Sequence, residues 1–268
     1  MSTIEPMTSG SSIAVIISTY NSPDYLRRVL ESYLFQTRLP DELIVADDGS
    51  TGETSDVIKA FKRKAPFNVG HVWHEDLGFR AAKIRNEAVK VCSSDYLIFS
   101  DGDCLPHRAF VADHAALARR GCFVQGKRML VKREASASFA PASLAQLATQ
   151  CFKREISGFH HLIRIPGFAV TRDGLRGIKT CNLAVYRDAV LAVNGFNEAF
   201  VGWGREDSEF AARLLAYGLK RIDPPFSALV FHLWHQENSR GNLADNDSLL
   251  ENTISSKVFR CACGIVKS

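Results

Sequence analysis

Two carboxylates that could hold a metal ion follow directly after an apolar run in the middle of the chain. Asp101 and Asp103 flank Gly102, behind the Tyr-Leu-Ile-Phe run at 96–99. A buried strand that ends in this way places negative charge at the carboxyl edge of a sheet, where open α/β folds bind ligands. Because Mg²⁺ and Mn²⁺ prefer oxygen ligands and keep sites for substrate phosphates, the stretch predicts a metal–diphosphate site. The alternative is a surface turn, for which Asp-Gly is common.

A second candidate site lies in the stretch from Gly202 to Asp207. Trp203 stands between two glycines, which let the backbone approach a ligand closely, and its indole offers a flat surface for a sugar ring or a packing wedge. Glu206 and Asp207 fall in the first turn of an expected helix, where acidic residues complement the macrodipole without any ligand. We favour a functional role for the stretch, because the macrodipole does not explain the tryptophan.

Two further polar clusters complete the set of candidates. Asp47 and Asp48 end an apolar run at 42–46. His232 lies in a later apolar run, with His235 three residues on. The histidines are either hydrogen-bonded core residues or metal ligands, and their place near a strand end keeps both interpretations open.

The first 120 residues predict strands that alternate with helices. Continuous apolar runs indicate buried strands, and apolar residues at helical spacing indicate helices. The expected strands are 13–17, 42–46, 69–74 and 96–99, and the expected helices are 23–36, 54–64, 81–91 and 106–119. This order predicts an α/β fold, a Rossmann-like and mostly parallel sheet flanked by helices in a single large domain. The strand ends at 19–21, 47–48 and 101–103 then share one edge, which is the candidate site.

The second half of the chain is less regular. Strands are expected at 122–131, 180–185 and 227–234, with helices at 188–193 and 206–217. The segment 134–176 mixes Ser, Ala, Arg and His, including His160 and His161, and we interpret it as an acceptor loop or as a lid that orders over bound donor. Beyond Gln236 the chain is polar, with a short amphipathic end at 258–266.

Composition excludes several classes of protein. The 268 residues are 46% hydrophobic and 23% charged, which is ordinary for one large globular domain. A net charge of +4 is too small to argue for nucleic acid, although it suits anionic substrates. The seven cysteines show neither a zinc spacing nor a disulfide framework, so a reducing cytoplasm fits best. No run has the length of a signal peptide or a membrane span, so we expect a cytoplasmic protein whose membrane contact would be peripheral.

Five motifs in a fixed order resemble family 2 glycosyltransferases with the GT-A fold. Those of the nucleotide-sugar half are Ile-Ser-Thr-Tyr-Asn at 17–21, Ala-Asp-Asp-Gly-Ser at 46–50, Arg-Asn at 85–86 and Asp-Gly-Asp at 101–103. Gly-Trp-Gly-Arg-Glu-Asp at 202–207, with His232, resembles the acceptor half of the galactosyltransferase type and of bacterial capsule and chondroitin polymerases. We divide the chain into a disordered N-terminus at 1–12, a nucleotide-sugar-binding half at 13–133, an acceptor-binding and catalytic half at 134–240 and a C-terminal tail at 241–268.

The resemblance implies an inverting enzyme that moves a hexose from a UDP-sugar to a hydroxyl of a glycan acceptor. Asp103, with His232, would hold a divalent metal, Mn²⁺ or Mg²⁺, on the donor diphosphate, and Asp101 would support the metal or the ribose. The other donor-binding residues that it implies are Thr19, Tyr20, Asn21, Asp47, Asp48, Arg80, Lys83, Arg85 and Gly102.

The resemblance also assigns the acceptor side. Asp207 would be the general base that takes the proton of the acceptor hydroxyl as it attacks the anomeric carbon opposite UDP, so that an α-linked donor gives a β-linked product. Glu206 and Trp203 would bind sugars, and Glu206 is the next candidate for the base. Such a module is typical of bacterial enzymes that extend lipopolysaccharide, capsule or a related polysaccharide on the cytoplasmic face.

Two other functions stay open. A sugar-nucleotide pyrophosphorylase also binds its nucleotide at the edge of a parallel sheet, but it would need a glycine-rich basic loop after the first strand, and residues 18–23 have none. A non-catalytic sugar- or nucleotide-binding module could share the fold, although Asp103 and Asp207 argue against it.

Overall fold

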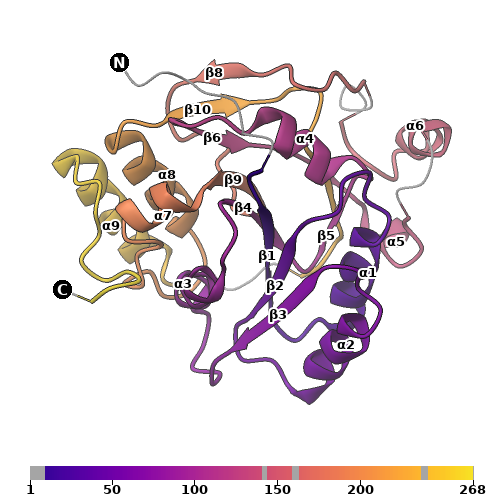
Figure 1. The fold of residues 1–268 in the computed structure, drawn as a ribbon, viewed down its shortest axis with the longest axis horizontal. Coiled ribbons are helices and arrows are strands. Elements are labelled where there is room, and N and C mark those ends of the chain that lie inside the picture. Colours follow the sequence, from indigo (N-terminus) through magenta and orange to yellow (C-terminus); the bar gives the residue numbers. More distant parts are fainter. Residues whose placement is uncertain (1–9, 141–143, 159–162, 237–240, 268) are drawn as a thin grey trace.

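A mixed eight-stranded sheet forms the centre of the molecule (Figure 1). The computed structural model describes residues 10–140, 144–158, 163–236 and 241–267. The strand order is β3-β2-β1-β4-β9-β6-β10-β8. These strands are β1 Ile13–Thr19, β2 Glu42–Asp47, β3 Asn68–Trp73, β4 Tyr96–Asp101, β6 Cys122–Gln125, β8 Val170–Arg172, β9 Asn182–Tyr186 and β10 Lys220–Asp223. The first four strands of the chain pair in parallel, which confirms the predicted α/β fold with a mostly parallel sheet.

Helices cover both faces of this sheet, so the molecule has three layers. One face carries α1 Pro23–Tyr33, α2 Gly52–Lys62 and α4 Phe110–Leu117, and the other carries α3 Ala81–Val91, α7 Arg187–Ala192 and α8 Glu206–Ala216. In α1, Pro23 occupies the first turn, where its missing N–H costs nothing, and a buried apolar stripe faces the sheet. Strand β1 lies between the two helical layers, and its apolar residues are buried on both sides.

A separate three-stranded sheet brings distant residues to the candidate site. It consists of β5 Cys104–Pro106, β11 Leu229–His232 and β7 Lys127–Leu130, in that order. Strand β5 begins directly after Asp103, and in its antiparallel pairing with β11 Cys104 lies opposite His232. The pairing therefore places His232 beside Asp103, although the two are far apart in the sequence.

Two expectations for the middle of the chain were wrong in detail, and one strand was missed. The predicted strand 122–131 is two strands, because the chain passes from the large sheet to the small one at Gly126. A Cβ at Gly126 would lie 2.2 Å from the Asn182 side-chain oxygen, so the crossing requires glycine. The predicted helix 106–119 begins only at Phe110, since residues 104–106 pair with β11. Strand β10 was not predicted at all.

The remaining segments also hold elements that the sequence did not predict. Within 134–176 the structure has α5 Arg133–Ser136, α6 Leu144–Phe152 and β8, whereas His160 and His161 lie outside the described residues, as do residues 1–9. The predicted tail contains α9 Leu243–Ser256, which packs on α8. Its buried residue is the polar Asn246, which explains why hydrophobic periodicity gave no signal. The described residues 258–266 form no helix.

Two further findings concern helix length and the cysteines. Within the described ranges, no helix combines the length and the apolar character needed to cross a bilayer. All seven cysteines are free thiols.

Candidate active site

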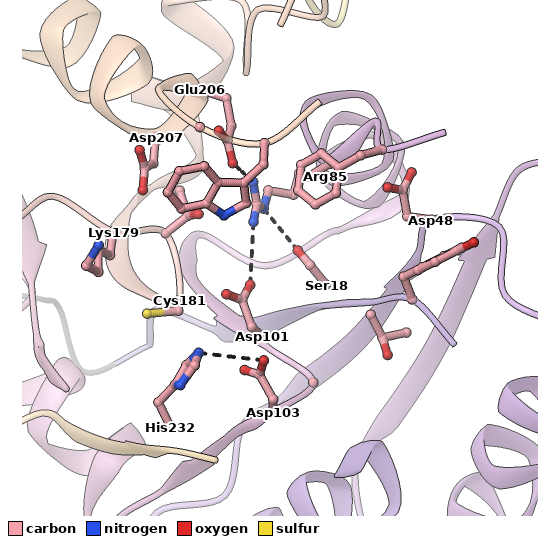
Figure 2. A pocket seen from close by; sticks show the side chains of 18 of the residues that line it. Ser18, Asp48, Arg85, Asp101, Asp103, Lys179, Cys181, Glu206, Asp207 and His232 are labelled. Atoms are coloured by element: carbon pink, nitrogen blue, oxygen red, sulfur yellow. Dashed lines mark hydrogen bonds and ion pairs between the residues drawn. The ribbon is translucent and has the colours of Figure 1, made fainter. Parts of the chain in front are cut away.

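A cavity of about 1160 Å³ opens at the carboxyl ends of β1 and β4 (Figure 2). The loop before β9, the start of α8 and the end of β11 form its other walls. The predicted site residues that line it are Thr19, Tyr20, Asn21, Asp48, Arg85, Asp101, Gly102, Asp103, Trp203, Glu206, Asp207 and His232. Three predicted site residues, Asp47, Arg80 and Lys83, do not line this cavity.

One corner of the cavity has the donor set of a metal site. Asp103 Oδ2 lies 3.6 Å from His232 Nε2 and 3.1 Å from His235 Nε2. Burial raises the pKa of Asp103, but the hydrogen bond from His235 and the charges of both histidines outweigh it and lower the pKa. The same hydrogen bond raises the pKa of His235 to about 9. Asp103, His232 and the thiol of Cys104 offer ligand atoms that all lie within 4.8 Å of one another, a spacing that could hold a divalent ion. His235, which the sequence left open as a ligand, contacts Asp103 at the edge of this group.

Arg85 on α3 contacts side chains from three different elements at the centre of the cavity. Its guanidinium donates to Ser18 Oγ at 2.9 Å, to Asp101 Oδ1 at 3.4 Å and to Glu206 Oε1 at 3.5 Å, and Figure 2 shows these three contacts. The guanidinium also lies 5.5 Å from the ring centroid of Phe196. Burial raises the pKa of Asp101 to about 6, with a further rise from Asp103 and an opposing effect of Arg85. A buried cation thus links the Asp101 end of the site to the start of α8.

The two acidic residues that begin α8 have different surroundings. Glu206 faces Arg85, and burial together with the charge of Asp207 raises its pKa to about 7. Asp207 faces the cavity beside Lys179 (Figure 2). Burial raises the pKa of Asp207, and the charges of Arg85 and Lys179 partly oppose that rise. A carboxylate that lines the cavity without being committed to Arg85 is suited to accept a proton.

The loop that carries Trp203 depends on both of its glycines and on α9. Gly202 and Gly204 have φ values of +76° and +108°, which favour glycine. The side chain of Asn246 donates to Gly204 O at 2.9 Å, and that of Asn242 donates to Val201 O at 3.1 Å. Helix α9 therefore holds the loop from behind while Trp203 lines the cavity.

Asp48 marks the opposite, strand-end side of the cavity. It accepts a hydrogen bond from the Arg80 N–H at 2.9 Å, and its Oδ1 lies 2.6 Å from His74 Nε2. Burial raises its pKa, and these two partners oppose the rise. Arg80 thus contacts Asp48 through its backbone N–H, while its side chain hydrogen-bonds the Glu75 carbonyl and acts on Asp48 only through its charge.

Asp47, predicted together with Asp48, is engaged elsewhere. It is buried, accepts from the Ser50 N–H at 2.8 Å and lies 3.1 Å from His71 Nε2. These contacts stabilise the turn after β2, in which Gly49 has a φ of +97° and a Cβ would lie 2.6 Å from Asp76. Lys83 lies on α3, half-buried and away from the cavity wall.

Comparison with known proteins identifies the family. A model described as glycosyl transferase family 2 matches residues 14–173, and one described as the N-terminal domain of galactosyltransferase matches residues 160–236. The chain belongs to glycosyl transferase family 2. Membership of this family argues against the pyrophosphorylase that the sequence left open.

Curated relatives of this glycosyltransferase agree with that membership. Validoxylamine A glucosyltransferase of Streptomyces hygroscopicus subsp. limoneus is 29% identical over 240 residues, 81% of this chain and 51% of the relative. Chondroitin synthase of Pasteurella multocida is 24% identical over 233 residues, 80% of this chain and 24% of the relative. The chain thus spans about half of the first relative's length and about a quarter of the second's.

Solved structures confirm the GT-A fold of the glycosyltransferase. TarS of S. aureus, residues 1–349, aligns with a TM-score of 0.63 at 17% identity, covering 92% of this chain and 65% of TarS. The mannosyltransferase PcManGT of Pyrobaculum calidifontis, in complex with GDP-Man and Mn2+, aligns with a TM-score of 0.60 at 18% identity, covering 92% of this chain and 64% of that one. At these identities the likeness shows the fold alone.

Several residues of the glycosyltransferase cavity were not predicted. Lys179, Cys181 and Arg128 line it, and Cys104 contributes a thiol that donates to Asp103 Oδ1 at 3.3 Å. None of them belongs to a motif quoted above, and Lys179 lies in a loop whose position depends on tertiary contacts. Only the pairing of β7 and β9 with their neighbours brings these side chains to the site.

Proposed function

We propose that this glycosyltransferase is an inverting, metal-dependent enzyme that moves a hexose from a UDP-sugar to a hydroxyl of a glycan acceptor. The observation that carries the proposal is that the Asp103–histidine corner and Asp207 line the same cavity from different elements. A donor whose diphosphate lies at the corner would place its sugar toward Asp207. The structures of PcManGT in complex with GDP-Man and Mn2+, and of TarS in complex with UDP, support a nucleotide-sugar donor and a metal for this chain.

The donor would bind along the strand-end side of the cavity. Tyr20, Asn21 and Asp48 lie where a nucleoside would extend away from the diphosphate, and Asp48 offers a carboxylate oxygen to a ribose hydroxyl or a base N–H. Asp103 and His232, with His235, would hold Mn²⁺ or Mg²⁺. When bound, the metal supplies positive charge against the negative charge that grows on the departing diphosphate.

Asp207 would then perform the proton transfer. The acceptor oxygen attacks the anomeric carbon from the face opposite the diphosphate, the bond from that carbon to the diphosphate oxygen breaks, and the hydroxyl proton passes to a carboxylate oxygen of Asp207. Attack from the opposite face converts an α-linked donor into a β-linked product. Arg85 holds Glu206 and Asp101 in place and so positions the two sides of the site relative to each other.

Product analysis tests this function. The protein with Mn²⁺ and a panel of UDP-hexoses should release UDP without pyrophosphate, and excess chelator should abolish the release. The anomeric coupling constant of the transferred sugar in proton NMR should report a β-linkage. Full activity in chelator would refute the metal assignment, and an α-linked product would refute inversion.

The proposed acceptor is a bacterial surface glycan such as lipopolysaccharide or capsule, extended at the cytoplasmic face with at most peripheral membrane contact. The free thiols agree with a reducing compartment. Fractionation of cells that express the protein tests this: recovery with the membranes only at low salt would support peripheral contact.

A further inference from the structure

Five lysine and arginine residues line the cavity, and they differ in whether a carboxylate neutralises their charge. Two of the basic residues that line it are paired, Arg85 with Asp101 and Glu206, and Arg205 with Asp247. Three other basic residues line the same cavity, namely Arg128, Arg176 and Lys179. Among the residues that the structure describes, these three have neither an ion pair nor a side-chain hydrogen bond.

Lys179 is held at a fixed place by the end of β6. The buried side chain of Gln125 accepts from the Lys179 N–H at 2.9 Å and donates to the Lys179 carbonyl oxygen at 3.2 Å. The ammonium group acts electrostatically on both Asp207 and His232. Lys179 lines the same cavity as the proposed base and His232, and Figure 2 shows it beside Asp207.

Arg128 approaches the same region from the small sheet. It lies on β7 opposite Val230 of β11, two residues before His232, and its charge also acts on His232. Arg176 stands three residues before Lys179 in the same loop, at the exposed rim of the cavity. Cations from two separate elements thus face the space that the transferred sugar and the acceptor would share.

We infer that Arg128 and Lys179 form an anion-binding subsite, so that the glycosyl substrate carries a carboxylate or a phosphate in addition to the donor diphosphate. The inference rests on the proposed function, which places the donor diphosphate at the Asp103 corner. There the metal would neutralise the charge of the diphosphate, so Arg128 and Lys179 are not needed for that purpose. Hydrogen bonds between charged partners are the strong ones, and a guanidinium suits the planar carboxylate or the phosphate of a sugar. The anionic group belongs either to the donor sugar, as in a hexuronate, or to the acceptor.

Binding measurements with matched ligands separate these two sources. In the donor arm, calorimetry compares UDP-glucuronate with UDP-glucose, each with Mn²⁺. In the acceptor arm, it compares a glucuronate-containing disaccharide with a neutral disaccharide, each added to the protein loaded with UDP and Mn²⁺. In the arm that holds the anionic group, the anionic ligand should bind more tightly in the wild type, and Arg128→Gln or Lys179→Gln should each reduce that preference by about 10- to 100-fold.

Two controls define the result. Lys127→Gln removes a neighbouring cation of β7 that is paired with Asp223 at 3.2 Å and does not line the cavity, so it should leave the preference unchanged. Lys179→Arg, which keeps the charge, should retain most of it. Equal loss of affinity for UDP alone in the glutamine variants would assign both cations to the diphosphate and overturn the inference.

If the wild type shows no preference for the anionic ligand in either arm, the inference is wrong. The proposed function fails independently, through absence of any turnover of UDP-sugars with Mn²⁺, because the binding arms need no turnover.

Discussion

Asp207 and Glu206 are adjacent in sequence and line the same cavity, but Glu206 is paired with buried Arg85, so Asp207 is the proposed base. Because a base is needed only while the acceptor hydroxyl loses its proton, Asp207→Asn should lower kcat by about 10²- to 10⁴-fold and leave the affinity for UDP with Mn²⁺ nearly intact. Steady-state kinetics and calorimetry on the same preparation check both parts. If this variant transfers sugar at close to the wild-type rate, Asp207 is not the base, and Glu206 is the next candidate.

Glu206→Gln provides the matched comparison. Glu206 is a partner of buried Arg85, so its loss should disturb the position of Asp101 and lower stability as well as rate. A structural role for Asp207 would show itself in the same way, as joint loss of stability and UDP binding.

The charge of Lys179 should be visible in the pH dependence of the rate. Burial raises the pKa of Asp207, so kcat should fall as the pH drops through that raised value and the base becomes protonated. Lys179 stabilises the carboxylate form, and its removal must raise the pKa of Asp207 further. The acid limb of kcat for Lys179→Gln should therefore lie at higher pH than that of the wild type.

Profiles of kcat between pH 4 and 8 test this shift, with Lys127→Gln as the charge-matched control, since Lys127 is occupied by Asp223. An acid limb that stays in place in Lys179→Gln would mean that another group limits the rate.

At the scale of elements, helix α9 stabilises a loop that it follows in the sequence. Asn246→Ala removes the donor to Gly204 O and a second hydrogen bond, at 3.3 Å, to Val201 O. We expect the free energy of unfolding to fall by about 1–3 kcal/mol, because Gly204 O loses its side-chain donor, whereas Val201 O keeps its hydrogen bond from Asn242. Amide hydrogen exchange of residues 201–206 should accelerate more than that of the β1–β4 core.

Asn252→Ala changes an exposed residue of the same helix and serves as the control. Unchanged exchange in the Trp203 loop of Asn246→Ala would show that the glycines, Arg205 and Asn242 fix its shape without Asn246.

The sequence predicted those parts of the site that follow from strand ends. Thr19 and Asp101 were located correctly because apolar runs that alternate with helical patterns leave little choice of topology. Lys179 and Arg128 reach the cavity through a loop and the small sheet, contacts that no local pattern encodes, whereas the sequence singled out His235 without deciding whether it binds a metal. Helix α9 was missed for a related reason, since it buries an asparagine where periodicity searches for apolar residues.

At the scale of the whole molecule, donor and metal should stabilise the fold together. A ligand that binds only the native state adds about 2.7 kcal/mol at 100 times its Kd, which for a domain of this size corresponds to a rise in Tm of about 5 to 10 °C. Differential scanning calorimetry with UDP and Mn²⁺ should show this rise for the wild type. Chelator or Asp103→Ala should remove most of it, and a rise that persists in chelator would contradict joint binding at Asp103.

The hydrogen bonds from Asn242 and Asn246 to the Trp203 loop also have a consequence for the synthesis of the chain. Ribosomes add about 5 to 20 residues per second, and Asn246 emerges about 40 residues after Gly204, which corresponds to roughly 2 to 8 s. The strands β1 to β4 can pair before that moment, whereas the Trp203 loop lacks its hydrogen bonds until Asn242 and Asn246 have been synthesised. A nascent chain should therefore form the strand ends of the donor side earlier than a fixed sugar-binding wall. A chain that ends after His235 but before Asn242 should bind UDP yet transfer nothing.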